Sequence, residues 1–230
     1  LGELIPYVLV LGVIALLMLK EPHMSGTILV LAAAAAILFT AGIRWGWFAL
    51  GGGLMGVVMA LIVFVGGYNS DRIKTWLNPW WDPGDKGYQI VQSLYAVASG
   101  GLTGLGFGQS RQKYLYLPEE QNDFIFAIIC EELGFIGAAL IIILFALLII
   151  RGYWLALHAR DRFGSLLIVG ITTLLAVQVF LNIAVVTNFI PTTGISLPFF
   201  SYGGTALMIQ LLEMGVILSV SRQIPAPKQG

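Results

Sequence analysis

Long unbroken blocks of apolar residues constrain the fold of this chain more than any other feature. Six blocks lie roughly at residues 4–19, 25–43, 46–67, 124–150, 164–187 and 204–220. A helix of about 20 residues crosses the hydrocarbon of a bilayer. The blocks lack the 3.6-residue spacing that gives a soluble helix one apolar face, and lipid tolerates a helix that is apolar on every side. The sequence therefore predicts an all-α polytopic membrane protein with about six transmembrane helices.

The composition supports this class and argues against others. Hydrophobic residues make up 58% of the 230 positions and charged residues 10%, whereas soluble domains carry about 25% charged residues. The formal net charge is zero, so nothing indicates a nucleic-acid partner. A lone cysteine, Cys130, excludes a disulfide framework within the chain and a cysteine metal cluster.

The apolar blocks divide the chain into three parts. We expect three transmembrane helices in residues 1–67, one large polar loop in residues 68–123, and three more helices in residues 124–230, with a turn at 188–203 and a polar tail. Within the loop, residues 88–97 (YQIVQSLYAV) favour a short amphipathic helix at the membrane interface. The chain begins without Met inside an apolar segment, which suggests a piece of a longer protein.

The basic residues of the short links predict the orientation. If the loop 68–123 is outside the cytoplasm, the inside links near residue 44, at 151–162 and at 222–228 contain most of the Lys and Arg found outside that loop. Cytoplasmic links carry such an excess. We therefore expect an extracytoplasmic loop and a cytoplasmic C-terminus in a cell membrane.

The most polar run, residues 104–123 (GLGFGQSRQKYLYLPEEQND), offers two interpretations of its glycines. They are typical of a flexible turn, which is the simpler interpretation. Successive exposed N–H groups in such a stretch can also hold phosphate. Arg111 and Lys113 follow directly and favour an anion site, because phosphates attract paired cations. The alternative for both side chains is interfacial contact with lipid headgroups.

Three carboxylates lie near the start of the fourth apolar block. Asp123 is either a helix N-cap or a general base whose pKa is raised by partial burial, and the two roles are compatible. Glu131 and Glu132 lie two turns further on, where a charge requires a partner or a wet cavity. Asp123, Ala127 and Glu131 would share one helical face at i, i+4 and i+8. This face would point into a polar cavity or at Arg111 and Lys113.

A second polar patch, NFIPTTGISLPFFSYGG, occupies residues 188–204. Its prolines and glycines between apolar blocks suggest a folded re-entrant turn, which persists at membrane depth only against protein or water.

The segment from Leu77 to Gly137, which contains QSRQKYLYLPEEQNDFIFA, resembles the signature loop of the SEDS family (shape, elongation, division and sporulation). The patch at 188–204 resembles the second extracellular motif of the same family. The motif sequence QSRQKYLYLPE is more similar to the FtsW and SpoVE branch of the family than to the RodA branch. Family members have about ten spans, so the resemblance implies that the first four are absent from this chain.

The resemblance implies a peptidoglycan glycosyltransferase that polymerises lipid II during septal or spore wall synthesis and releases undecaprenyl pyrophosphate. It assigns the essential aspartate to Asp123. The other motif positions that we predict to contact substrate are Arg111, Lys113, Glu119, Glu132, Thr192, Ser201 and Tyr202. We add Gln92 and Ser93 of the amphipathic helix as candidate substrate contacts.

Partners and alternatives follow from the same resemblance. It implies a class B penicillin-binding protein, other divisome membrane proteins and membrane lipids as partners, and a divalent cation, Mg²⁺ or Mn²⁺, as an optional cofactor whose ligands are unknown. Two other functions fit the residues: a lipid II flippase, which would use the buried glutamates as a polar path, and a scaffold without catalytic activity that positions a penicillin-binding protein.

Overall fold

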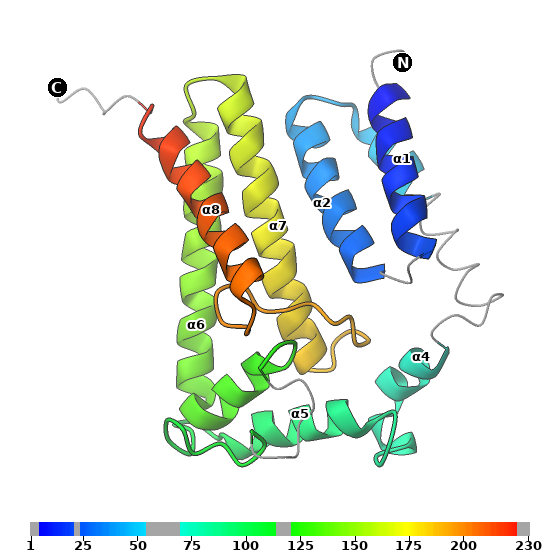
Figure 1. Cartoon of the computed structure of the whole chain (residues 1–230), viewed down its shortest axis with the longest axis vertical. Helices are drawn as coiled ribbons and strands as arrows, with labels where there is room; N and C mark the ends of the chain where they lie inside the picture. The colour runs from blue at the N-terminus through cyan, green and yellow to red at the C-terminus, as the bar shows by residue number, and fades with distance from the viewer. Residues whose placement is uncertain (1–4, 21–23, 54–69, 114–120, 225–230) are drawn as a thin grey trace. The chain divides into compact units, whose positions relative to one another are not determined.

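The computed structural model describes residues 5–20, 24–53, 70–113 and 121–224. Within these ranges all regular structure is helical, as the sequence predicts (Figure 1). Residues 45–53 are helical. The other elements are α1 (Ile5–Lys20), α2 (Met24–Thr40), α4 (Ser70–Leu77), the 3-10 helix η1 (Pro79–Trp81), α5 (Tyr88–Ser99), α6 (Ile125–Leu157), α7 (Arg162–Val186) and α8 (Gly204–Ser221).

Among the described residues, three helices are long and apolar enough to cross a membrane: α6 with 33 residues, α7 with 25 and α8 with 18. Their length and apolar composition support the predicted membrane location. Helices α1 and α2 are also apolar but shorter, with 16 and 17 residues. The predicted span 46–67 is described only as far as residue 53.

The chain divides into two compact units. The first contains α1, α2 and the parts of α6, α7 and α8 within residues 147–177 and 205–224. Its core joins Leu155 of α6 to Ile168 of α7 and Ile217 of α8. Helix α7 begins beside Asp161, whose carboxylate accepts the Gly164 N–H at 2.8 Å. Because this bond satisfies one of the free N–H groups at the helix start, Asp161 fixes where α7 begins.

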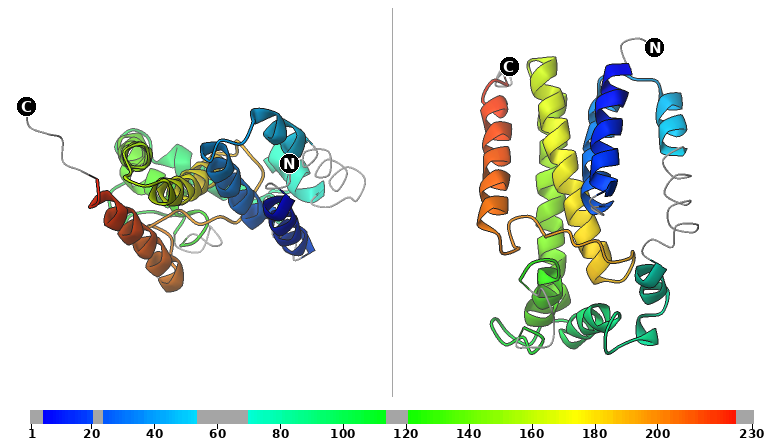
Figure 2. Two further views of the ribbon diagram at one scale, coloured as in Figure 1. Left: turned by 90° about the horizontal axis from the view of Figure 1, so that it is seen from above. Right: turned by 45° about the vertical axis from the view of Figure 1, so that its right-hand side comes forward.

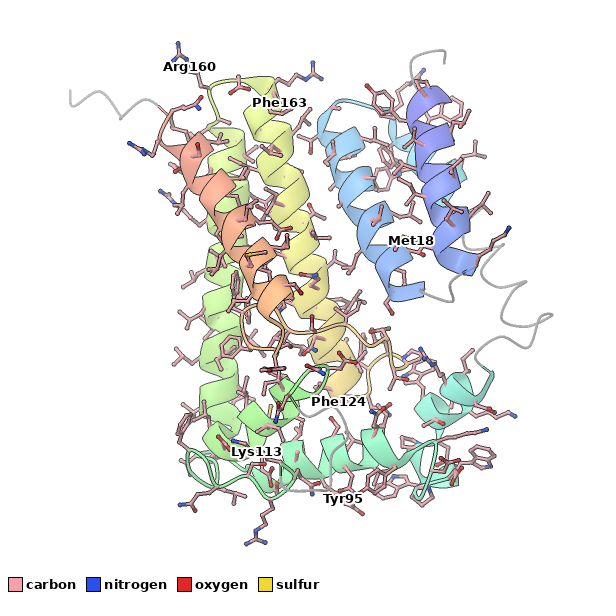
Figure 3. The ribbon with its side chains drawn as sticks, viewed as in Figure 1. Met18, Tyr95, Lys113, Phe124, Arg160 and Phe163 are labelled. Carbon is pink, nitrogen blue, oxygen red and sulfur yellow. The ribbon has the colours of Figure 1, made fainter. Side chains whose placement is uncertain are left out.

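The second unit contains residues 44–53, α4, η1, α5, the loop 100–113, residues 121–146 and residues 178–204. Its core gathers Ile90 of α5, Phe124 (labelled in Figure 3), Val186 of α7 and Leu197 of the following turn. Helix α6 packs beside α7 in each unit (Figure 2). These contacts hold the polar loops against the helix ends, where the candidate site lies.

The amphipathic helix predicted at residues 88–97 is confirmed as α5. Its side chains Ile90, Val91, Ser93 and Ala96 are buried in the second unit, while Tyr95 on the opposite side is exposed. The one-sided burial follows the 3.6-residue spacing of the apolar positions.

Candidate active site

Asp123 lies in a turn two residues before α6, half-buried, and its position is fixed by a buried amide. The side-chain N–H₂ of Asn182 in α7 donates to the Asp123 carbonyl at 2.8 Å and to the Ile195 carbonyl at 2.7 Å. Asn182 is only 1% exposed. One side chain thus ties the segment before α6 to the turn after α7. A buried amide with two such bonds is well placed to hold both segments in register.

The Asp123 carboxylate lies against Gly194 of this turn. A Cβ added to Gly194 would come within 3.4 Å of Asp123 Oδ2, and Gly194 has a φ of +69°. This position requires a positive φ and space for the carboxylate. Glycine provides both, because it adopts positive φ without strain and has no side chain.

The two polar motifs are joined by further hydrogen bonds next to Asp123. The Ser201 hydroxyl donates to the Asn122 carbonyl at 2.7 Å and accepts the Leu197 N–H at 2.7 Å. The Tyr202 N–H donates to the Gln121 carbonyl at 2.7 Å. Ser201 and the Tyr202 backbone therefore position the segment that carries Asp123, while the Tyr202 side chain is exposed.

Asp123 lines a cavity of about 520 Å³ in the second unit. Helix α4 and the residues before and within α5 provide one wall, and the other wall comes from the start of α6, the end of α7 and the turn after it. The lining residues are Asp71, Arg72, Thr75, Lys86, Gln89, Asp123, Phe124, Val185, Thr192 and Gly194. The cavity thus combines two carboxylates with two cations.

The two cations of this cavity are held in different ways. Lys86 Nζ donates to Asp71 Oδ2 at 2.6 Å. This hydrogen bond, with the attraction between the charges, holds the pKa of Asp71 below its usual 3.8 and raises the pKa of Lys86 above 10.5. Arg72 Nη1 donates to the Thr192 carbonyl at 3.3 Å. One guanidinium bond leaves further N–H donors for an anion, since a guanidinium has five.

Helix α4, which carries Asp71 and Arg72, is anchored to the turn after α7 by a reciprocal pair of hydrogen bonds. Trp76 Nε1 donates to the Asn188 carbonyl at 3.2 Å, and Asn188 Nδ2 donates to the Trp76 carbonyl at 3.3 Å. Helix α4, which contributes Arg72 to the cavity wall, is therefore fixed to the turn that contains Gly194.

The glycine-rich loop packs its backbone directly on α6. The N–H groups of Leu105 and Gly106 donate to the carbonyls of Glu131 and Glu132 at 3.0 and 3.1 Å, and Phe135 N–H donates to Gly101 O at 2.9 Å. A Cβ on Gly104 would overlap the Glu132 carbonyl. The N–H groups of Leu105 and Gly106 are therefore already bonded and are not available to hold a phosphate. Gly104 is needed for the close approach of the two backbones.

Glu131 holds the end of the same loop. Its carboxylate accepts the Ser110 hydroxyl at 2.5 Å and the N–H groups of Arg111 and Gln112 at 3.2 and 3.3 Å, and it is 1% exposed. Glu132 accepts the Ser110 N–H at 3.4 Å. The partners of Glu131 among the described residues are thus loop donors, and the ion pair with Arg111 or Lys113, one of the two predicted alternatives, is not formed among them.

The shared helical face expected for Asp123 and Glu131 is also wrong. Helix α6 begins at Ile125, and a kink at Gly134 (φ +67°, ψ −169°) interrupts it. Asp123 therefore lies outside the regular helix. Its carboxylate is directed at Gly194, whereas that of Glu131 is directed at the loop.

The predicted substrate residues fall into separate places. Asp123 and Thr192 line the cavity. Arg111 and Lys113 are exposed (Lys113 is labelled in Figure 3), and neither they nor Glu132 nor Gln92 line it. Ser93 is fully buried and donates to the Val186 carbonyl at 2.9 Å, so the expected substrate contact is replaced by a packing role. Glu119 lies outside the described residues.

Three residues of the site were missed from the sequence. Arg72 and Lys86 lie in the predicted outer loop, but far along the chain from Asp123 and without a neighbouring motif. Asn182 suggests only a hydrogen bond between helices. The one sequence feature that could have indicated Arg72 and Lys86 was their basic charge in a segment expected outside the cytoplasm.

No group of three or more His, Cys, Asp or Glu side chains in the described part of the chain is arranged to hold a metal ion. In the cavity, Asp71 is engaged by Lys86. Asp123 lines the same cavity, and its carboxylate could contribute to a cation site together with phosphate oxygens of a substrate, the mode that Mg²⁺ commonly uses.

The helices and the cavity define an all-α integral membrane protein with a polar, charge-lined pocket beside the end of a spanning helix. The chain belongs to the FtsW/RodA/SpoVE family of cell cycle proteins, whose family model matches residues 1–225.

Curated relatives support this membership. The chain is 51% identical over 210 residues to Stage V sporulation protein E of Bacillus subtilis (strain 168), covering 90% of this chain and 57% of the relative. It is 44% identical over 220 residues to the probable peptidoglycan glycosyltransferase FtsW of Geobacter sp. (strain M18), covering 95% and 60%. The chain thus spans somewhat over half the length of these relatives.

Solved structures are similar in fold. A chain from a peptidoglycan synthase complex, studied for its coordination of polymerization and crosslinking, superposes with a TM-score of 0.76 at 29% identity, covering 96% of this chain and 62% of the other. The rod shape determining protein RodA of Thermus thermophilus gives a TM-score of 0.62 at 26% identity, covering 96% and 56%.

Proposed function

We propose that the protein containing this chain is a peptidoglycan glycosyltransferase that polymerises lipid II into glycan strands and releases undecaprenyl pyrophosphate. The observation that carries the proposal is the half-buried Asp123 in a cavity that also presents Arg72 and Lys86. The names of the FtsW relatives support the reaction class.

The proposed topology has six spans in this chain, with residues 68–123 and 188–203 outside the cytoplasm and the C-terminal tail inside. The basic links support it through the positive-inside rule. It places the cavity on the side of the membrane where wall sugars are joined.

In the proposed reaction the Asp123 carboxylate removes the proton from the 4-hydroxyl of the acceptor sugar. The hydroxyl oxygen then forms a bond to the anomeric carbon of the donor, and the bond from that carbon to the pyrophosphate oxygen breaks. The electron pair leaves with undecaprenyl pyrophosphate, and a single displacement inverts the anomeric carbon. A general base in this position contributes about 10²–10⁴ in rate.

The cavity provides cations for the negative charge of the leaving group. Arg72 has free guanidinium donors, and Lys86 supplies a second charge that Asp71 partly offsets. Donors placed where charge develops lower the barrier. Arg111, Lys113, Glu119 and Glu132 remain proposed contacts for more distant parts of a large substrate. The proposal includes a divalent cation, Mg²⁺ or Mn²⁺, that relies mainly on substrate phosphates for its ligands.

A class B penicillin-binding protein is the proposed partner, and other divisome membrane proteins are proposed to join it. The similarity to a chain of a peptidoglycan synthase complex supports this assignment.

The test is lipid II polymerisation by the purified full-length protein, with and without the partner and the divalent cation. We expect Asp123→Asn to form no glycan, while Asp85→Asn, a loop carboxylate outside the cavity lining, retains most activity. Transport of labelled lipid II across vesicles without polymerisation would instead indicate a flippase. Unchanged growth of cells that depend on Asp123→Asn would indicate a scaffold.

A further inference from the structure

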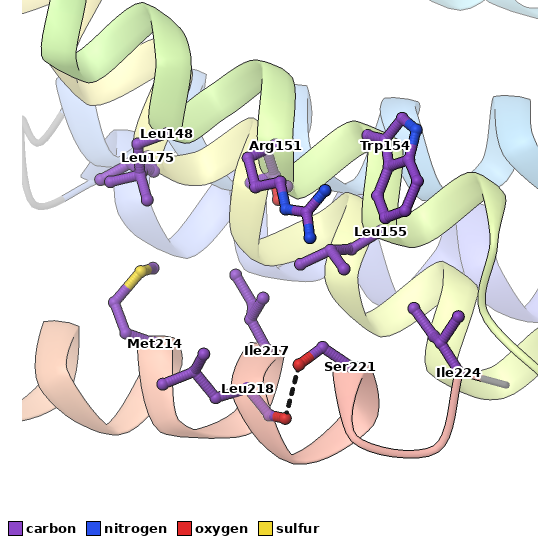
Figure 4. A pocket seen from close by; sticks show the side chains of 12 residues that line it. Leu148, Arg151, Trp154, Leu155, Leu175, Met214, Ile217, Leu218, Ser221 and Ile224 are labelled. Carbon is purple, nitrogen blue, oxygen red and sulfur yellow. Dashed lines mark hydrogen bonds between the residues drawn. The ribbon is translucent and has the colours of Figure 1, made fainter. Parts of the chain in front are cut away.

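A second cavity, of about 500 Å³, lies in the first unit between α6, α7 and α8 (Figure 4). Most of its wall is aliphatic or thioether, from Leu148, Leu155, Leu175, Met214, Ile217 and Leu218. All three helices are candidate membrane spans. The cavity is therefore an apolar recess within the membrane-embedded part of the protein, and it shares no residue with the Asp123 cavity.

One cationic side chain, that of Arg151, lines this recess. The guanidinium carbon of Arg151 lies 4.2 Å from the ring centroid of Trp154, which also lines the cavity. Stacking on an indole holds a guanidinium in place through its face and leaves its N–H edge available. No acidic residue is found among the lining side chains that the structure describes. The guanidinium is thus set up to accept an anion from outside the chain.

A buried hydroxyl that lines the recess also lacks a partner within the described part of the chain. Thr172 is 1% exposed and lines the cavity, and its Oγ1 has no hydrogen bond within the described part of the chain. A buried hydroxyl left unpaired costs free energy. By contrast, the Ser221 hydroxyl, which also lines the cavity, donates to the Leu218 carbonyl at 2.8 Å, the dashed line of Figure 4. A ligand with an acceptor oxygen would satisfy Thr172.

From this arrangement we infer that the recess between α6, α7 and α8 binds an anionic glycerophospholipid of the surrounding bilayer. Its phosphate lies at Arg151, an ester oxygen accepts the Thr172 hydroxyl, and an acyl chain fills the aliphatic part. The charge of Arg151 decides between this occupant and an apolar helix from elsewhere in a longer chain, because a helix would leave the guanidinium without a counter-ion. Basic pockets between transmembrane helices bind acidic lipid headgroups in this way.

The test uses the full-length protein in detergent and two lipids with identical acyl chains. We expect dioleoylphosphatidylglycerol to raise the unfolding temperature more than dioleoylphosphatidylcholine does. Arg151→Gln should weaken phosphatidylglycerol binding by about fivefold, which corresponds to one basic residue at an anionic membrane. Arg151→Lys should lose less affinity for phosphatidylglycerol than Arg151→Gln does, because it keeps the positive charge.

The matched control is Arg160→Gln, which removes the same charge from the link between α6 and α7 without touching the cavity (Arg160 is labelled in Figure 3). It should bind phosphatidylglycerol like the wild type. Thr172→Val should leave the unfolding temperature without lipid nearly unchanged and reduce the rise that phosphatidylglycerol causes. Equal effects of the two lipids, or equal losses in Arg151→Gln and Arg160→Gln, would overturn the assignment, as would the absence of binding.

Discussion

Asp123 and Glu131 are carboxylates from adjoining stretches of one sequence motif, but their surroundings differ. Glu131 is almost fully buried and accepts three hydrogen bonds from the loop at residues 110–112. Asp123 is half-buried and faces a cavity with Arg72 and Lys86. The Glu131 carboxylate is enclosed by loop donors and holds structure, whereas the Asp123 carboxylate lines a charged cavity that a ligand can enter. The comparison separates a structural acid from a proposed catalytic one.

The largest effect that we expect comes from the loop that Glu131 holds. Gly104 and Gly108 have nearly equal positive φ, +79° and +77°, but a Cβ on Gly104 would overlap the backbone of Glu132 while that on Gly108 meets open space. Gly108→Ala should therefore cost only the strain of the backbone, about 1 kcal/mol. Gly104→Ala should cost several times more or prevent folding. Thermal unfolding of both full-length variants measures the difference, and equal losses would disprove direct backbone packing.

The next effect concerns Glu131 itself. Glu131→Gln replaces a charged acceptor by an amide that can accept fewer of the three donors, so it should lower the free energy of unfolding by about 2–3 kcal/mol. Glu132→Gln, with one longer bond of 3.4 Å, should lose less than about 1 kcal/mol. Limited proteolysis of the loop 100–113 and thermal unfolding measure both. If the two variants are equally stable, Glu131 does not have the structural role given to it.

On the Asp123 side, Arg72 should matter for substrate binding. Arg72→Ala removes a cavity cation, and we expect KM for lipid II to rise about tenfold, the factor that corresponds to about 1.4 kcal/mol. Lys74→Ala is the matched control, since Lys74 lies on the same helix but outside the cavity lining. Steady-state polymerisation kinetics distinguish them, and a similar KM for both variants would remove Arg72 from the site.

The smallest effect that we expect is on how the stability of the fold depends on pH. The lowered pKa of Asp71 means that its pair with Lys86 contributes stability above about pH 4 and loses it as the pH falls below this value. The raised pKa of Lys86 means that this contribution persists up to about pH 10.5 and is lost above it. Between pH 5 and 9 the unfolding temperatures of wild type and Asp71→Asn should therefore run in parallel. Converging curves in this range would show that the pair titrates there.

The helices could largely be predicted from sequence, because lipid imposes length and apolarity on each span. The predicted blocks 164–187 and 204–220 agree closely with α7 and α8. The block ending at residue 150 was too short, because α6 continues to Leu157. Arg151 interrupts the apolar run without ending the helix, because arginine is a good helix former. Its side chain stacks on Trp154.

The site was predictable only in part. Asp123 and Thr192 belong to recognisable motifs, and both line the cavity. Arg72 reaches the cavity through tertiary contacts, chiefly the bonds between Trp76 and Asn188, which no local pattern encodes. The glycines suggested a phosphate site, because phosphate binding and close backbone packing both favour glycine. Only the fold shows which donors are already occupied.

The most direct test of the catalytic role of Asp123 is the rate of glycan formation per lipid II bound, measured for the full-length Asp123→Asn variant at saturating lipid II. We expect a rate at least about 100-fold below wild type, with lipid II affinity and unfolding temperature nearly unchanged. A rate close to wild type, or a loss of rate fully explained by weaker binding, would contradict it.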